Sequence, residues 1–342
     1  MDNVSKYSGP IVGNINKNII YDYIIYHKNC MDGFTGFFIF MKTKLWKPKP
    51  MIYPDVPSTK EVPPNIKNKN VIIMDVAYKP DILKKIAKKA KYVLFIDHHI
   101  TIRDDILDLQ NAGKNLKVIY DEYESGASLV WKYCFPKLKM PKFVELIKDN
   151  DIGTWKLPNT LPFMSALEVN FTCEPTFENL QKWDNLLLDD YLSAMIERGK
   201  VYDEYKSFLI KKQSHQITTR FFPSIKIIDY VNKNYKDKHN LKEGMYKVSI
   251  VDGGCPSTSL LGKYIAENTD CDFCLLYHYN MNKKIYIISL RSKSTNIGEI
   301  AKYLGGGGHK LAAAFSVSSN DFHIDDLFVD LFVDNNTKKI DI

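Results

Sequence analysis

The sequence predicts an α/β protein of two domains, a parallel-sheet domain followed by a smaller mixed α/β domain. Its length of 342 residues suits two domains of ~100–200 residues each. In the first half, short apolar runs alternate with helical patterns, as they do in βαβ units around a parallel sheet. A hydrophobic share of 45% and a charged share of 25% are typical of a globular chain, which excludes disorder, collagen and coiled coil.

Three apolar runs in the first half predict strands that are buried on both faces, because none of them alternates with polar residues. Apolar residues at helical spacing follow the second run, beginning near Pro80, and predict a helix before the third run. The same spacing over 127–134 predicts another helix. The three strands are expected at 23–26, 71–74 and 92–96.

The second half has the pattern of a smaller α/β unit, joined to the first half by a charged helix. We therefore divide the chain into a first domain at 15–192, a linker helix at 193–213 and a second domain at 214–342. In the second domain, strands are expected at 246–251, 271–279, 285–290 and 312–317, and helices at 257–267 and 296–304.

Composition also indicates where the protein works. No apolar run approaches the ~18 residues of a membrane span, and the polar first residues lack the apolar core of a signal peptide. The six cysteines are therefore interpreted as free thiols rather than as a disulfide framework. We expect a cytoplasmic protein with no membrane partner. A net charge of +7 suits a polyanionic partner without requiring one.

Side chains that could bind metal follow each of the three predicted strands and one apolar helical segment. Because parallel α/β sheets bind their ligands at the carboxyl ends of the strands, these side chains are expected to converge. A single Asp after a strand is more often a helix N-cap. Several crowded carboxylates, however, repel one another without a cation, and mixed imidazole and carboxylate donors suit manganese, iron, cobalt or zinc. The candidates are His27, Cys30, Asp32, Asp75, Asp97, His98, His99, Asp149 and Asp151.

Two motifs together resemble a known family. Asp97-His98-His99 matches the signature of the DHH phosphoesterases, and the other clusters follow in that family's order. The run Gly305-Gly306-Gly307-Gly308-His309, preceded by Arg291, resembles the DHH-associated substrate domain. The resemblance covers about 23–317 and implies a catalytic metal-binding first domain and a substrate-binding second domain. It also implies two divalent metal ions, with Mn²⁺ as the first choice and Co²⁺, Fe²⁺ or Zn²⁺ as alternatives.

The resemblance implies a role for each candidate residue. Asp75 would bridge the two metal ions, and His99 would point toward the scissile phosphate. Asp97 would orient an imidazole, because a metal-binding His usually donates its other N–H to such a group. Either Asp149 or Asp151 would complete the second metal position, and the spacing leaves both open. The remaining ligands would be His27, Cys30 and Asp32 from the first motif and His98 from the triplet.

Cys30 departs from the family pattern, since many members have Asp at this place. A thiolate ligand would shift the preference of the site toward zinc, iron or cobalt relative to manganese. The alternative is a neutral cysteine that only packs beside a weaker first metal position. Both interpretations stay open.

The glycine run predicts a phosphate-binding segment. Gly305 alone would be explained as the C-cap of a helix. Four consecutive glycines exceed what a cap requires, and backbone N–H groups without side chains can form an anion-binding nest. His309 and Arg291 could add charged donors, and bidentate phosphate binding is a task for which lysine is a poor substitute.

These expectations combine into a metal-dependent phosphodiesterase or exonuclease that acts on short single-stranded RNA or DNA, with oligoribonuclease-like activity first. Adenosine bisphosphate and linear or cyclic dinucleotides are alternative substrates, and a longer RecJ-like exonuclease is a further relative. The rival class is a non-catalytic nucleotide or nucleic-acid binder, which Cys30 alone favours. A homodimer is compatible with the sequence.

Overall fold

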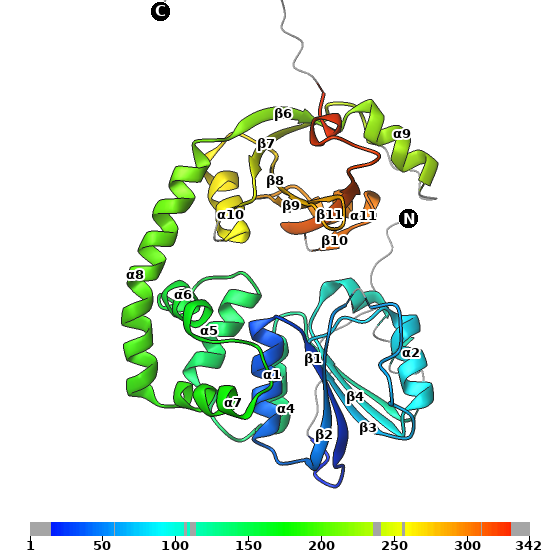
Figure 1. Ribbon diagram of the computed structural model, residues 1–342, viewed down its shortest axis with the longest axis vertical. Helices are drawn as coiled ribbons and strands as arrows, with labels where there is room; N and C mark the ends of the chain where they lie inside the picture. The colour runs from blue at the N-terminus through cyan, green and yellow to red at the C-terminus, as the bar shows by residue number, and fades with distance from the viewer. Residues whose placement is uncertain are drawn as a thin grey trace, which may run out of the picture. The chain divides into compact units, whose positions relative to one another are not determined.

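The computed structural model of the chain describes residues 15–57, 59–105, 108–109, 114–234, 241–254, 257–308 and 310–329 (Figure 1). The chain divides into two compact units, Met1–Asp203 and Glu204–Ile342. In the described residues, the first unit holds a parallel sheet and the second a mixed sheet. The predicted fold class is therefore confirmed.

The described part of the first unit forms a five-stranded, all-parallel sheet in the order β2-β1-β3-β4-β5. The strands are β1 Tyr21–His27, β2 Trp46–Asp55, β3 Asn70–Met74, β4 Tyr92–Asp97 and β5 Leu116–Tyr120. The helices that accompany them are α1 Met31–Met41, α2 Pro80–Lys89, η1 Ile100–Asp105, α4 Gly126–Cys134, α5 Lys142–Asp151, α6 Thr160–Asn170, α7 Phe177–Asp184 and η2 Asn185–Leu187.

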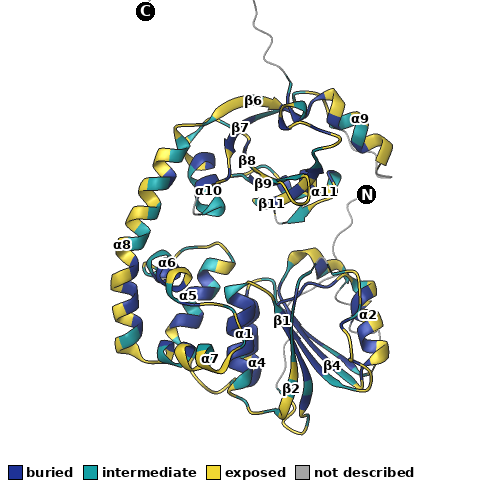
Figure 2. Cartoon of the chain, viewed as in Figure 1, coloured by how far each residue is buried: buried dark blue, intermediate teal, exposed yellow. Residues whose placement is uncertain are grey.

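The central strands are buried on both faces, as their continuous apolar runs predict (Figure 2). Ile24 and neighbours that point the same way join one apolar cluster, which also includes residues of α1 and α4. Ile25 and other strand side chains that point to the opposite face belong to a second apolar cluster, which includes residues of α2. Because the side chains of a strand alternate between its faces, helices on both sides can bury them.

Several elements of the first unit were not predicted, and two of them, β2 and α1, lack the usual signals. Edge strand β2 contains Pro48, Pro50 and Pro54, and an edge strand tolerates proline because one of its sides has no ladder to donate to. Helix α1 is buried at every position from Asp32 to Phe40, so it has no polar face to reveal a helical period.

The described part of the second unit forms a six-stranded sheet in the order β10-β11-β9-β8-β7-β6. Only β7 and β8 pair in parallel among the described strands, and the other pairs are antiparallel. The strands are β6 Thr218–Phe222, β7 Tyr246–Asp252, β8 Phe273–Asn280, β9 Ile285–Arg291, β10 Gly307–Gly308 and β11 Ala312–Ser318. The helices are α9 Ile225–Asn234, α10 Thr258–Asn268, α11 Ile297–Tyr303 and η3 Ile324–Leu327.

A single helix, α8 Asp189–Ser214, covers the predicted linker at 193–213, and the division between the two units falls within this helix. The predicted domain boundaries stay a prediction. In the described residues, no helix combines the length and the apolar character needed to cross a bilayer. The cytoplasmic location and the homodimer stay predictions.

Candidate metal centre

The carboxyl ends of the parallel strands bring the predicted side chains to one edge of the sheet. Tyr26 of β1 pairs with Met74 of β3, and Met74 pairs with Ile96 of β4. The residue that follows each of these three is therefore in the same row, namely His27, Asp75 and Asp97. The parallel register thus brings together residues that are far apart in the chain.

Asp75 lies at the centre of the cluster and presents its two carboxylate oxygens to different side chains. Its Oδ2 is 3.3 Å from Nδ1 of His27 and 3.4 Å from Sγ of Cys30. Its Oδ1 is 3.2 Å from Nε2 of His98. Asp75 is buried, and its φ of 63° is a left-handed conformation that costs a non-glycine residue free energy. The surrounding contacts hold it there.

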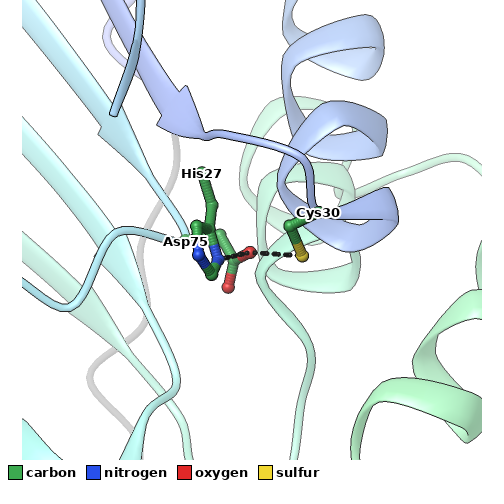
Figure 3. Close-up of side chains that lie close together, drawn as sticks. All are labelled: His27, Cys30 and Asp75. Carbon is green, nitrogen blue, oxygen red and sulfur yellow. Dashed lines mark hydrogen bonds and ion pairs between the residues drawn. The ribbon is translucent and has the colours of Figure 1, made fainter. Parts of the chain in front are cut away.

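The first group of donors consists of His27, Cys30 and Asp75 (Figure 3). His27 is the last residue of β1, and Cys30 is the N-cap of α1, where its sulfur accepts a hydrogen bond from the Gly33 N–H at 3.5 Å. One ligand atom from each of the three residues lies within 4.8 Å of the other two. The strand end and the helix start thus aim their side chains at the same carboxylate oxygen.

The second group surrounds His98 on the other side of Asp75. Nε2 of His98 is 3.3 Å from Oδ2 of Asp151, which is the last residue of α5. Asp32 joins them, with one ligand atom of each of Asp32, His98 and Asp151 within 4.8 Å of the others. The carboxylate of Asp32 also accepts from the N–H of Ala127 in the first turn of α4, at 3.2 Å.

The carboxylate of Asp97 contacts the ring of His99, and the orienting role that the resemblance implies for Asp97 stays a prediction. Oδ1 of Asp97 is 2.8 Å from Nδ1 of His99 and accepts from the backbone N–H groups of His98 and His99. Burial alone would lower the pKa of His99, but the charge and hydrogen bond of Asp97 outweigh burial and raise it to about 9. Asp97 therefore favours the protonated form of His99 in the metal-free protein.

The carboxylates of the cluster repel one another, and a bound cation would offset this repulsion. Burial, together with the charges of Asp151 and Asp75, raises the pKa of Asp32 well above its usual range. Burial acts on Asp75 in the same direction, but hydrogen bonds from His27 and His98 keep the pKa of Asp75 well below its usual range. Buried carboxylates are stable when they are paired or bind metal. The nitrogen, oxygen and sulfur donors present here fit manganese, iron, cobalt or zinc.

The structure brings Asp151 into the cluster and leaves Asp149 outside it. The Asp149 carboxylate accepts hydrogen bonds from the hydroxyls of Thr154 and Thr160 and from the backbone N–H groups of Lys156 and Leu157. Burial would raise its pKa, but these four donors lower it. Asp149 thus stabilises the segment that follows α5 through these hydrogen bonds, whereas Asp151 faces His98.

In the second unit, most of the glycine run has a structural explanation. The N–H groups of Gly305 and Gly306 donate to the carbonyls of Lys302 and Ala301 at the end of α11. A Cβ at Gly306 would lie 2.1 Å from the Ala314 oxygen, and one at Gly308 would lie 2.5 Å from Cα of Ala313. Among Gly306, Gly307 and Gly308, only at Gly307 does a Cβ meet nothing within 4 Å. In the described part of the predicted anion-binding segment, only the short strand β10 keeps backbone amides that are not used at the end of α11. Phosphate binding by this strand stays a prediction.

Arg291 ends β9, on the strand next to β11, with which β10 pairs. Its guanidinium donates to the Leu290 carbonyl at 2.7 Å and to the Ser259 hydroxyl at 2.8 Å. Both partners are uncharged, and no carboxylate pairs with Arg291 in the described part of the chain. Burial lowers its pKa. His309, the last residue of the predicted motif, lies outside the described residues.

Comparisons with known proteins place this geometry in context. No family model matches the chain. The uncharacterized protein R106 of Acanthamoeba polyphaga mimivirus is 28% identical over 335 residues, which cover 93% of this chain and 73% of that protein. The chain resembles the DHH phosphoesterases.

Three solved structures illustrate the likeness to DHH phosphoesterases. RecJ in complex with Mn²⁺ from Thermus thermophilus has a TM-score of 0.47 and 14% identity, over 87% of this chain and 50% of that one. The pGpG-specific phosphodiesterase PggH from Vibrio cholerae has a TM-score of 0.43 and 14% identity, over 87% and 94%. An exopolyphosphatase-related protein from Bacteroides fragilis has a TM-score of 0.43 and 13% identity, over 86% and 87%. Similarity at this level decides neither the reaction nor the substrate.

Two glycines beside the cluster around Asp75 were missed by sequence reasoning. A Cβ at Gly126 would lie 2.6 Å from Cβ of Asp75 and 2.9 Å from Oδ2 of Asp32. A Cβ at Gly33 would lie 2.6 Å from Cβ of His27. The only signal in the sequence is that Gly33 follows Asp32 directly, and for Gly126 there is none, because its neighbours in space are distant in the chain.

Proposed function

We propose that the chain is a metal-dependent phosphoesterase that hydrolyses phosphodiester or terminal phosphate bonds of short single-stranded oligonucleotides or small nucleotides. The observation that carries this proposal is the carboxylate of Asp75, whose two oxygens face two separate groups of metal-binding side chains. Two divalent ions, with Mn²⁺ as the first choice, would supply a water of lowered pKa and offset negative charge on the phosphate.

The side chains around Asp75 would then divide the work. His27, Cys30 and Asp75 would hold one ion, and His98, Asp151 and Asp32 would join Asp75 around the other. Asp97 would keep the His99 ring in one orientation, through the contact of 2.8 Å between its Oδ1 and Nδ1 of His99. An imidazole N–H in this position can donate a hydrogen bond to a phosphate oxygen that gains negative charge during hydrolysis.

We assign substrate binding to the second unit, through Arg291 and the glycine run. The guanidinium of Arg291 is held in place by uncharged partners, so its charge is available to a phosphate. Gly307 and Gly308 are on the strand β10, which pairs with Ala313 and Ala314, next to the Ala312–Arg291 pair. This neighbourhood supports a shared phosphate-binding role for the arginine and the glycines.

The test of the activity is hydrolysis of a short RNA with Mn²⁺, compared between the wild type and Asp75→Ala. We expect the variant to lose more than about 100-fold in rate, because it removes the group shared by both donor sets. Asp81→Ala is the matched control, since Asp81 is exposed on α2 and pairs only with Lys85 among the described residues. The substrate panel includes linear and cyclic dinucleotides and adenosine bisphosphate.

Two results would contradict this proposal. If the wild type releases no product from any substrate with Mn²⁺, Co²⁺ or Zn²⁺, the protein is not a phosphoesterase of this kind. If it then still binds oligonucleotides, it belongs to the rival class of non-catalytic binders. Circular dichroism of Asp75→Ala must show a folded protein for the loss of rate to count.

The test of substrate binding is Arg291→Ala. We expect about tenfold weaker binding of a phosphate-ended oligonucleotide and little change for the dephosphorylated one, because a charge-assisted hydrogen bond contributes about 1.5–3 kcal/mol. Arg220→Ala is the control, since Arg220 forms an ion pair with Asp325. Equal losses for the two ligands would remove Arg291 from phosphate binding.

A further inference from the structure

The two donor groups around Asp75 differ in chemistry. The group of His27, Cys30 and Asp75 offers a nitrogen, a sulfur and an oxygen atom. The groups on the other side, which include His98, Asp151 and Asp32, offer only nitrogen and oxygen. Sulfur is thus present on one side of the shared carboxylate and absent from the other in the described clusters.

Neither capping nor packing explains why Cys30 is a cysteine. Its position is the N-cap of α1, where Ser, Thr, Asp and Asn are preferred because their oxygen is a better acceptor than sulfur. Cys30 belongs to none of the apolar clusters of the described residues, whereas Cys134 is in one of them. Its sulfur instead lies against a carboxylate, 3.4 Å from Oδ2 of Asp75 (Figure 3).

The local backbone aims the sulfur at this carboxylate. The Gly33 N–H donates to Sγ at 3.5 Å and fixes the rotation of the side chain. The S–H group of Cys30, at the start of α1, donates to Oδ2 of Asp75 at 3.4 Å. Sγ of Cys30 and Nδ1 of His27 therefore approach the same oxygen of Asp75 from two elements.

We propose that Cys30 makes the two metal positions unequal, so that the His27–Cys30–Asp75 position selects Zn²⁺ or another sulfur-preferring divalent ion and the His98 position takes Mn²⁺. The inference rests on the proposed two-ion centre and adds its metal selectivity. Thiolate ligands favour zinc over manganese, and sites of nitrogen and oxygen donors accept manganese. As the metal–sulfur bond forms, the S–H bond breaks and its proton leaves to solvent.

The test is cobalt spectroscopy of the full chain after its metals have been removed. Co²⁺ bound to a thiolate has a sulfur-to-cobalt charge-transfer band in the near ultraviolet. We expect this band in the wild type and in Cys271→Ser, the control for a half-buried cysteine of the second unit. We expect it to be absent from Cys30→Asp and Cys30→Ser, both of which keep an N-cap acceptor at this position.

Competition between Zn²⁺ and Mn²⁺, with bound metal counted by elemental analysis, is the second readout. We expect the wild type to hold both metals, and Cys30→Asp to lose about tenfold or more of its preference for zinc at one position. Cobalt bound without the band, or equal preference in the wild type and Cys30→Asp, would overturn the inference and leave the proposed function standing. A wild type that binds neither metal would overturn both.

Discussion

Asp149 and Asp151 are two residues apart at the end of α5, yet their carboxylates have different tasks. Four donors satisfy Asp149, and its carboxylate stabilises the segment after the helix. Asp151 instead lies 3.3 Å from His98, and burial raises its pKa. At the scale of the single residue, the fold has separated a structural carboxylate from a candidate ligand.

This difference predicts opposite effects of the same substitution. Asp149→Asn should lower the free energy of unfolding by about 1–3 kcal/mol, because an amide cannot accept all four hydrogen bonds. Asp151→Asn should weaken Mn²⁺ binding and leave stability unchanged or higher, because desolvation and repulsion by Asp75 disfavour its charge more than His98 favours it, which raises its pKa. Urea unfolding and metal titration of both variants check this.

The stabilising effect of Asp149 should depend on pH. Its pKa is lowered in the folded state, so its stabilising effect is present above the unfolded pKa of ~3.9 and disappears as pH falls through the folded pKa. Asp149→Asn should therefore cost less stability in acid than at neutral pH. Unchanged stability of Asp149→Asn at neutral pH would show that these hydrogen bonds contribute nothing.

His99 carries the second prediction at this scale. Its pKa is raised to about 9 in the folded protein, so the pair with Asp97 stabilises the metal-free fold below the unfolded pKa of ~6.5 and loses this effect as pH rises through about 9. Asp97→Asn should bring the pKa of His99 back toward its ordinary value, as followed by NMR titration of the imidazole. A His99 pKa that stays near 9 in Asp97→Asn would assign the shift to another group.

At the scale of the element, α4 packs its first turn directly against the cluster. Gly126→Ala should weaken Mn²⁺ binding about tenfold and destabilise the protein by about 1–3 kcal/mol, because the new Cβ would lie 2.6 Å from Cβ of Asp75. Gly36→Ala is the matched control in α1, where the new Cβ would meet Val130 at 3.4 Å.

For the control we expect no loss of metal binding and up to ~1 kcal/mol of added stability, because alanine is a better helix former than glycine. Isothermal titration with Mn²⁺ and thermal unfolding distinguish the two variants. If Gly126→Ala binds Mn²⁺ as tightly as the wild type, the start of α4 does not position Asp75.

At the scale of the whole molecule, the two units have separate apolar cores in the described residues. All the clustered metal-binding side chains of the described residues are in the first unit. Mn²⁺ at about 100 times its Kd should therefore stabilise the first unit by about 2.7 kcal/mol for each ion bound and leave the second unit unchanged. Calorimetry of the full chain, with Mn²⁺ or with a chelator, should show one transition that shifts and one that does not.

Asp75→Ala is the control for this experiment, and its first transition should not respond to Mn²⁺. Equal shifts of both transitions in the wild type would place a metal site outside the cluster. The experiment needs no knowledge of the substrate, so it tests the metal centre independently of the reaction.

The sequence by itself determined the α/β class, the three central strands and the residues that follow them. These properties are local, because strand period, helix spacing and the order of residues along the chain express them directly. Edge strand β2 and helix α1 escaped prediction for the same reason, since prolines and an all-round apolar surface obscure the local signal.

Only the tertiary structure decided between Asp151 and Asp149, divided the oxygens of Asp75 between two donor groups, and placed Gly126 against that carboxylate. It also directed the amides of Gly305 and Gly306 to the end of a helix. Each of these outcomes is a distance between atoms that are separated in the chain and brought together by packing. No pattern of neighbouring residues contains such a distance.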